Sequence, residues 1–230
     1  MTFIENAEQV ARGAMREISP DLVDKFVSLI RFLSLHPDAA SALRGKFAPL
    51  IGTEEYVRRQ ARAFSQARNP RAPKPSATVP DEMVSVILVS YFGIESADVD
   101  RIKKEHLLSM NAENMVGDLL ERYLASVLEP EGWIWCSGAV VKAVDFIKPP
   151  VSTGSGWRLL QVKNRDNSEN SSSSAIRTGT NIEKWFRSFS KTGSLNWDAF
   201  PDATLKTILS ENEFRSFVRK HFFQLKALKK

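Results

Sequence analysis

Cysteine and histidine are scarce in this chain of 230 residues, and their scarcity limits the metal chemistry open to it. Cys136 is the only cysteine, which excludes an internal disulfide and any zinc site built from several cysteines. The three histidines are His36, His106 and His221, and their positions do not follow the spacing of metal ligands. A zinc centre therefore has no support in the sequence, and we expect Cys136 to be a buried apolar side chain.

Long apolar runs and glycine-rich phosphate loops are missing as well. No apolar stretch approaches the ~20 residues that span a bilayer. Residues 1–11 carry Glu5 and Glu8 and lack the basic region of a signal peptide. No glycine-rich loop indicates the use of ATP. We therefore expect a cytoplasmic protein without membrane contact, long enough for one or two domains with a sizeable core.

Charge gives a weak indication of the partner. The net charge of +5 and the pI of about 9.3 favour an anionic partner. Residues 69–76 combine three prolines with Arg71 and Lys74, which is typical of an extended linker or loop. The basic side chains of this segment either contact phosphate or are simply solvated.

Apolar residues at helical spacing fill the first 68 residues and recur after the linker. The first clear helix follows Ser19-Pro20-Asp21 and carries Leu22, Phe26, Leu29, Ile30 and Leu33. Further helices are expected over residues 53–66, 96–109 and 111–128, and residues 83–89 fit a helix or a buried strand, with the helix favoured. The segment Glu129-Pro130-Glu131-Gly132 ends the last of them.

A region of expected strands follows these helices. Strands are predicted at residues 133–136, 139–147 and 157–162, the third in the interior of the sheet because it is apolar on both faces. After a polar segment, Thr180-Asn181-Ile182-Glu183 matches a capping box and predicts a helix with Trp185, Phe186 and Phe189. Residues 204–230 are expected to be helical and basic. The chain is thus predicted to be an α/β protein whose N-terminal half is largely helical.

Three short segments place chemically useful side chains within reach of one another. They are Gly117-x-x-x-Glu121 on a helix, Val144-Asp145-Phe146 at a strand end, and Leu159-Leu160-Gln161-Val162-Lys163 at the end of another apolar run. A hairpin can bring Asp145 beside Lys163. Carboxylates and a backbone carbonyl are ligands that Mg²⁺ accepts, together with waters and a substrate phosphate. We expect Asp145, Glu121 and the Val162 carbonyl to hold Mg²⁺, and Lys163 to orient water or stabilise negative charge.

Simpler roles exist for the same residues. Glu121 can pair with Arg122 or face solvent on a helix surface. Asp145 and Lys163 can form an ion pair at a strand end without catalysis. Gly117 is expected to allow close approach of the helix to the sheet.

The pattern resembles the PD-(D/E)xK nuclease superfamily, in which a helical acidic residue, a hairpin aspartate and an acidic-x-lysine motif meet on a central mixed sheet flanked by helices. The resemblance implies catalytic roles for Asp145, Gln161, Lys163 and Glu121. Gln161 departs from the family pattern because it replaces the acidic residue, and a glutamine brings an amide oxygen without charge. The carboxylates of Asp166 and Glu169 are candidates to compensate.

A closer resemblance is to SinI-type type II restriction endonucleases. It is carried by residues 160–180, by Ile182-Glu-Lys-Trp-Phe-Arg187, and by Val116-Gly-Asp-Leu-Leu-Glu-Arg-Tyr123 with Gly132-Trp133. The resemblance implies a Mg²⁺-dependent homodimer that cuts both strands of duplex DNA at GGWCC (W is A or T), between the guanines. It also implies a cognate DNA methyltransferase that protects the same site.

The polar segment after the third strand is suited to reading DNA. Arginine can bond guanine in the major groove, acidic side chains can accept from cytosine, and asparagine and serine can bond base edges or phosphates. The expected DNA-binding residues are Arg165, Asp166, Asn167, Ser168, Glu169, Asn170, Arg177 and Lys184, with Arg187 as a further phosphate contact. The alternative is a flexible serine-rich loop.

The expected organisation is a helical region at 1–68, a linker or loop at 69–80, and a nuclease core at 81–230 with its DNA-recognition segment at 164–187. Two other functions stay open. One is a structure-specific or repair nuclease of the same superfamily, whose polar segment contacts only the DNA backbone. The other is a DNA-binding module that has lost catalysis, for which Gln161 is the main support.

Overall fold

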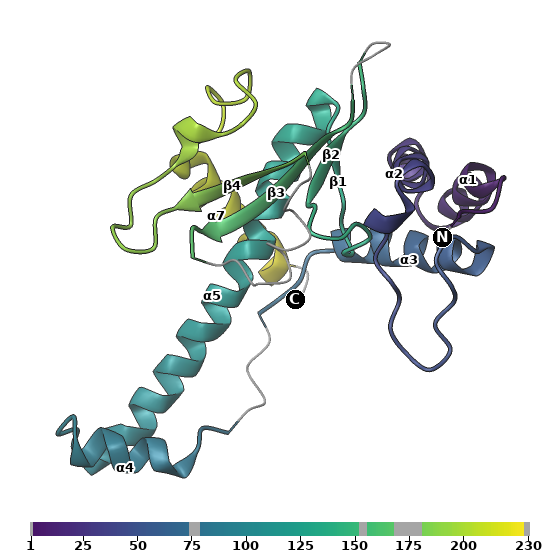
Figure 1. Ribbon diagram of the computed structural model, residues 1–230. Helices are drawn as coiled ribbons and strands as arrows, with labels where there is room; N and C mark the ends of the chain where they lie inside the picture. Colours follow the sequence, from purple (N-terminus) through teal and green to yellow (C-terminus); the bar gives the residue numbers. More distant parts are fainter. Residues whose placement is uncertain (1, 74–78, 152–155, 168–180, 228–230) are drawn as a thin grey trace.

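The computed structural model describes residues 2–73, 79–151, 156–167 and 181–227 (Figure 1). A mixed sheet of four strands has the order β1-β2-β3-β4, with antiparallel β1/β2 and β2/β3 pairs and a parallel β3/β4 pair. The strands are β1 (Ile134–Trp135), β2 (Phe146–Lys148), β3 (Arg158–Arg165) and β4 (Ile182–Ser188). The α-helices are α1 (Ala7–Ile18), α2 (Val23–Leu35), α3 (Glu54–Arg68), α4 (Glu82–Ser90), α5 (Val99–Leu128) and α7 (Glu211–Ala227). Among the described residues, no helix combines the length and apolarity needed to cross a bilayer.

The N-terminal helices follow the expected pattern. Helix α2 buries Phe26, Leu29 and Ile30, as their spacing predicts. Helix α3 starts after Thr53, whose side chain accepts a hydrogen bond from the Tyr56 backbone N–H. The helices α1 to α3 pack together at one side of the sheet (Figure 1).

The sheet separates two hydrophobic clusters, because neighbouring residues of a strand point to opposite faces. Ile134 of β1 and Ile147 of β2 join the cluster of α1, α2 and α3. Their neighbours Trp135 and Phe146, together with Leu160 of β3, join the cluster of α5 and α7. Strand β3 lies between β2 and β4, which confirms its predicted interior position.

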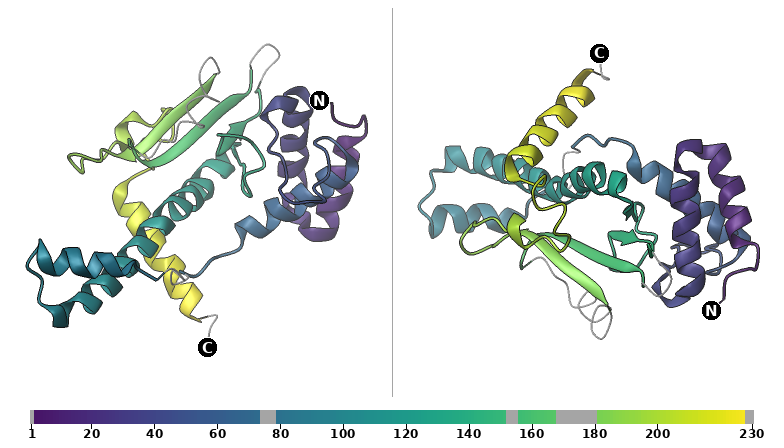
Figure 2. Two further views of the ribbon diagram at one scale, coloured as in Figure 1. Left: turned by 60° about the horizontal axis from the view of Figure 1, so that its bottom comes forward. Right: turned by 90° about the horizontal axis from the view of Figure 1, so that it is seen from above.

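The two helices expected at 96–109 and 111–128 are one continuous helix. Helix α5 has 30 residues and passes through Asn111 without a break. Asparagine lowers helix stability only slightly, and the segment between Ser109 and Met115 has no proline or glycine that could end the helix. The N-terminal half of α5 projects from the body together with α4 (Figures 1 and 2).

The strand expected at 139–147 is mostly wrong. Strand β2 begins only at Phe146, and the preceding residues form turns. Gly138, Ala139 and Ala143 have positive φ angles of 81°, 55° and 54°, which no strand accommodates. A Cβ added at Gly138 would lie 2.7 Å from the Ala63 backbone, so this turn is pressed against α3. The apolar residues of the segment serve the helical cluster in place of a sheet.

The helix expected after residue 180 is also wrong, because Ile182–Ser188 forms strand β4 parallel to β3. A ladder with β3 and the burial of Trp185 outweigh the local capping pattern. At the C-terminal end, helix α7 begins at Glu211 and not at 204. Residues 203–208 form turns, and Ser210 accepts from the Glu213 and Phe214 backbone N–H groups through its side chain and carbonyl.

Candidate active site

Asp145 is fixed where β2 begins, between β1 and β3. Its backbone N–H donates to the Leu160 carbonyl at 2.9 Å, and its own carbonyl accepts from Cys136 at 2.8 Å. Its side-chain Oδ2 accepts from the Val162 N–H at 2.7 Å. The predicted hairpin is therefore present; two hydrogen bonds fix the Asp145 backbone and a third orients its carboxylate.

The segment 162–165 of β3 and one face of α5 form a groove of about 630 Å³. Its described lining residues are Glu113, Asn114, Val116, Gly117, Leu120, Glu121, Val162, Lys163, Asn164, Arg165, Asn167 and Arg187. The groove brings Glu121 of α5 and Lys163 of β3 into one site. It is polar and open to solvent, which suits a charged macromolecular substrate better than a small apolar ligand.

Glu121 does not pair with Arg122, which bonds Asp118 at 2.7 Å instead. Glu121 Oε2 accepts from Trp135 Nε1 at 2.9 Å, so the helix residue is tied to strand β1. Burial and the negative charge of Asp145 raise the pKa of Glu121 to about 8, against the Trp135 hydrogen bond and the positive charge of Lys163.

The pKa of Asp145 is raised as well, to about 6. Burial is the main cause, and the hydrogen bond from Val162 and the charge of Lys163 act against it. Two carboxylates that are enclosed together and repel one another form a site that a bound cation would stabilise. The positive charge of Lys163 lowers the pKa of both carboxyl groups, but it offsets the effect of burial only in part.

The donor set fits Mg²⁺ and does not fit a closed zinc site. It consists of the Asp145 and Glu121 carboxylates and the Val162 carbonyl, and Mg²⁺ takes few protein carboxylates and keeps several waters. Within residues 2–73, 79–151, 156–167 and 181–227, no group of three or more His, Cys, Asp or Glu side chains gathers as a ligand cluster. Gln161 is only 1 % exposed on β3, so its amide is enclosed by the protein.

Asp166 is held by local contacts beyond the end of β3. Its Oδ1 accepts from the Ser190 backbone N–H at 2.8 Å, and hydrogen bonds from Ser190 lower the pKa of this carboxyl. These contacts tie the end of β3 to the segment after β4. The other candidate for compensating Gln161, Glu169, lies outside the described residues.

Gly117 has a different role from the expected one. A Cβ added there would meet no atom within 4 Å, so close approach between helix and sheet does not require glycine. Gly117 lines the groove one turn before Glu121, and the missing side chain leaves the groove open. Glu113 and Asn114 line it from the preceding turn. The i, i+4 spacing of Glu113, Gly117 and Glu121 could have revealed this face from sequence.

The expected DNA-binding residues divide into two groups. Arg165 and Asn167 line the groove beside Lys163. Lys184 lies on β4 and not on a helix, in register with Gln161 of the neighbouring strand. The remaining expected residues, Ser168, Glu169, Asn170 and Arg177, lie outside the described residues.

Arg187 also lines the groove but is occupied by protein partners. Its Nη1 bonds both oxygens of Glu211 at 2.8 and 2.9 Å, and its Nε donates to Asn164 Oδ1 at 2.9 Å. Both members of the Arg187–Glu211 ion pair are only 14 % exposed. The arginine therefore joins β4 to α7 and orients Asn164 toward the strand end.

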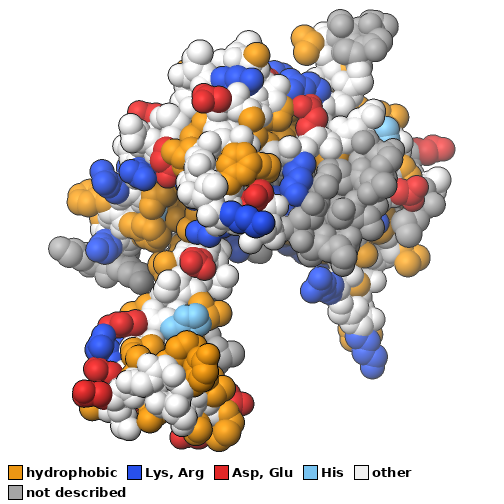
Figure 3. Space-filling model, turned by 60° about the vertical axis from the view of Figure 1, so that its left-hand side comes forward, with side chains coloured by type: hydrophobic (Ala, Val, Ile, Leu, Met, Phe, Trp, Pro, Cys, Tyr) orange, Lys and Arg blue, Asp and Glu red, His pale blue; other side chains and the backbone are white. Residues whose placement is uncertain are grey.

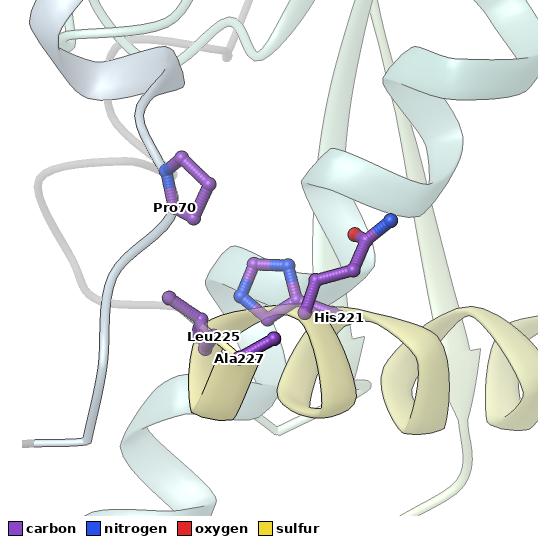
Figure 4. Close-up of a pocket in the computed structure, with 5 residues that line it drawn as sticks. Pro70, His221, Leu225 and Ala227 are labelled. Carbon is purple, nitrogen blue, oxygen red and sulfur yellow. The ribbon is translucent and has the colours of Figure 1, made fainter. Parts of the chain in front are cut away.

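A second cavity, of about 430 Å³, lies between Pro70 and α7 (Figure 4). His221, Leu225 and Ala227 face it from the helix, and Gln224 completes the described lining. None of these side chains is a carboxylate or an amine, so this cavity does not compete with the groove as a reaction centre. His221 is buried there, whereas His106 is exposed.

Comparison with known proteins identifies the family of the chain. The family model described as SinI restriction endonuclease matches residues 7–224. The chain is 52 % identical over 225 residues to the type II restriction enzyme Eco47I of Escherichia coli, covering 97 % of each chain. It is 50 % identical over 225 residues to the type II restriction enzyme SinI of Salmonella infantis, again with 97 % of each chain covered. The chain therefore belongs to the SinI restriction endonuclease family.

Proposed function

We propose that this protein is a Mg²⁺-dependent type II restriction endonuclease with a nuclease core of the PD-(D/E)xK type. Its substrate is duplex DNA with a short palindromic site, GGWCC, and it hydrolyses one phosphodiester in each strand. Family membership and the names of the two relatives support the restriction activity. The groove supports the chemistry, because Glu121, Val162 and Lys163 line it and Val162 N–H bonds the Asp145 carboxylate.

One observation carries the proposal. The Asp145 and Glu121 carboxylates are enclosed near one another; burial raises the pKa of both groups, and the negative charge of Asp145 raises that of Glu121 further. A site built only for stability gains nothing from this arrangement, since each buried charge lacks full compensation. A divalent cation would supply the missing positive charge, and functional sites are where such perturbed groups gather.

Each residue then has a defined role. Bound Mg²⁺ would polarise the phosphate and lower the pKa of a nearby water. Asp145, Glu121 and the Val162 carbonyl would hold it, and the hydrogen bond from Val162 N–H fixes the orientation of Asp145. Lys163 projects its charge into the same groove, where it orients the attacking water and stabilises the extra negative charge on phosphorus.

Gln161 places a neutral amide where the family pattern has a third carboxylate. It is buried on the central strand, where an uncompensated charge would be costly. The site therefore works with two acidic ligands, and we expect weaker Mg²⁺ binding than a three-carboxylate site would give.

The segment 164–187 is the proposed DNA reader, entered directly from β3. Arg165 and Asn167 extend the groove from Lys163 onward, so they lie next to the phosphate that is cut. Two antiparallel strands require two active sites, so the protein acts as a homodimer on a twofold site. A cognate methyltransferase protects the same sequence in the cytoplasm where both enzymes act.

The test is digestion of a plasmid of known sequence with Mg²⁺ or with EDTA. We expect discrete Mg²⁺-dependent fragments with ends at GGWCC, and no cutting by Asp145→Asn or Lys163→Met. Asp198→Asn is the matched control, because Asp198 is exposed away from the groove. Smearing or nicking would instead identify a structure-specific or repair nuclease. Retained DNA binding with no cleavage by the wild type would identify a lapsed module.

A further inference from the structure

The α4–α5 arm, defined here as residues 79–110, exposes an unusual amount of apolar surface. Helix α4 is largely apolar, yet none of its residues is buried. Ten large hydrophobic side chains of the arm are exposed: Val79, Met83, Val84, Val86, Ile87, Val89, Tyr91, Phe92, Leu108 and Met110. Figure 3 shows hydrophobic side chains gathered on the lobe that projects from the body. The described residues leave this surface exposed to solvent.

The area is large enough for a stable protein interface. The exposed fractions run from 39 % at Val89 to 89 % at Val79. Side chains of this kind carry roughly 150–200 Å² each, so the arm exposes on the order of 1,000 Å² of apolar surface. A monomer's largest apolar patch is usually about 300–600 Å². A standard interface takes about 800 Å² from each partner.

Charge argues against DNA as the occupant of this surface. The arm carries six acidic and three basic side chains, a net charge of −3, although the whole chain is at +5. Phosphate backbones and anionic membranes would be repelled by that balance. Two of the three basic residues also have partners within the arm: Arg101 pairs with Asp98 and Glu105, and Lys103 donates to Ser85. An apolar protein surface is the partner that fits.

We propose that a second copy of this chain docks on the arm, arm against arm, about a twofold axis. The inference rests on the proposed function, because a palindromic duplex needs two active sites related by such an axis. An isologous interface requires one patch that is complementary to itself, and an apolar helix face meets that requirement. The aromatic pair Tyr91 and Phe92 at the tip, 82 % and 63 % exposed, provides the kind of side chains that dominate interface energies.

Helix α5 connects this surface directly to the active site. Met110 belongs to the exposed patch, and Glu121 lies eleven residues further along the same unbroken helix. Eleven residues of α-helix span about 17 Å. Docking of the arms would therefore hold the two active sites at a fixed separation, with a helix and not a loop as the connection.

The experiment compares the full-length protein with Ile87→Glu and Tyr91→Glu by sedimentation equilibrium, with and without a duplex that contains the site. Both side chains are at least half exposed, so their replacement leaves the fold unchanged by far-UV circular dichroism. Phe47→Glu is the matched control, since Phe47 is 82 % exposed like Tyr91 but lies outside the arm. We expect a dimer for the wild type and the control, and a dissociation constant raised about 30-fold or more for the arm variants.

A monomeric wild type under both conditions would overturn the proposal. So would arm variants that dimerise as tightly as the wild type, or that lose DNA affinity while their dimerisation is unchanged. Digestion of a linear duplex separates this proposal from the proposed function. If the arm variants lose dimerisation but the wild type cuts nothing, the arm is the dimer interface and the proposed endonuclease function is wrong. If the variants remain dimeric and cut both strands normally, the proposed endonuclease function is supported and the arm is not the dimer interface.

Discussion

Glu129 joins three elements at the point where α5 ends, and its charge is the basis of a quantitative prediction. Its carboxylate bonds Lys25 of α2 at 2.6 Å, Arg68 of α3 at 2.7 Å and the Trp135 N–H of β1 at 3.2 Å. The side chains of Glu129 and Arg68 are only 11 % and 15 % exposed. The change Glu129→Gln keeps the shape and removes the charge that both cations need.

The expected cost follows from the burial of Arg68. Removing one partner of a buried ion pair costs about 3–5 kcal/mol, because the other charge stays enclosed. The glutamine oxygen still accepts one hydrogen bond, and Lys25 is exposed enough to turn toward water. We therefore expect the free energy of unfolding to fall by about 2–4 kcal/mol. In a domain of this size the melting temperature would fall by roughly 5–12 °C.

The assay is urea unfolding at neutral pH, followed by circular dichroism and tryptophan fluorescence. We expect the slope of the unfolding free energy against urea concentration to be the same for both proteins. Glu131→Gln is the control, since Glu131 is exposed two residues away and its replacement should change stability by less than about 0.5 kcal/mol. A loss below about 1 kcal/mol for Glu129→Gln would refute the view that this carboxylate joins the helical cluster to the sheet.

The same residue predicts the pH dependence. Burial raises the pKa of Glu129, but hydrogen bonds and charge from Arg68 and Lys25 outweigh burial and lower it overall from 4.5. A lowered folded pKa gives stability that is present above the unfolded value and lost as pH falls through the folded value. The difference between wild type and Glu129→Gln should therefore be full at neutral pH and shrink below 4.5. A difference that grows with acid would contradict the assignment.

Three other changes give expected outcomes. Gln161→Glu should lower the Mg²⁺ concentration needed for half-maximal cleavage. It should also cost about 1–3 kcal/mol of stability without metal, because the new charge is buried. An unchanged Mg²⁺ requirement would show that a carboxylate at position 161 does not reach the metal. Gly138→Ala should destabilise by more than about 2 kcal/mol in urea unfolding, because its φ is +81° and the new Cβ would lie 2.7 Å from Ala63. Gly117→Ala should instead stabilise by about 0.5–1 kcal/mol, since its Cβ meets no atom within 4 Å inside a helix; a loss of stability would show that the helix needs glycine there.

The hairpin that joins Asp145 and Lys163 could be predicted from the sequence because the necessary information is local. Asp145 and Lys163 stand at the ends of two apolar runs joined by a turn-rich segment, so antiparallel pairing brings them together. Helix α2 was equally predictable from its apolar spacing. Glu121 was placed correctly near the site, but its partner Trp135 was not foreseen, because no spacing rule relates a helix residue to a strand fourteen positions later.

The incorrect predictions fall where contacts between residues far apart in the sequence determine the secondary structure. The sequence of residues 180–183 matches a helix start. Residues 182–188 nevertheless form backbone hydrogen bonds with β3, and Trp185 is buried in the core. Residues 139–145 look like a strand because they are apolar, but their apolar side chains are buried by the N-terminal helices. Local propensity is outweighed by tertiary burial in both segments. The break expected near Asn111 was absent because nothing in the sequence forces one.

The unbroken course of α5 restricts how this chain can change length. Each residue added to an α-helix turns everything beyond it by about 100° and moves it by about 1.5 Å. An insertion between Met110 and Glu121 would swing the exposed arm around the body while the active site stayed on the sheet. Seven added residues would nearly restore the angle but lengthen the arm by about 10 Å. Substitutions at exposed positions outside the groove should therefore be tolerated in this stretch, whereas insertions and deletions would change the position of the arm relative to the groove.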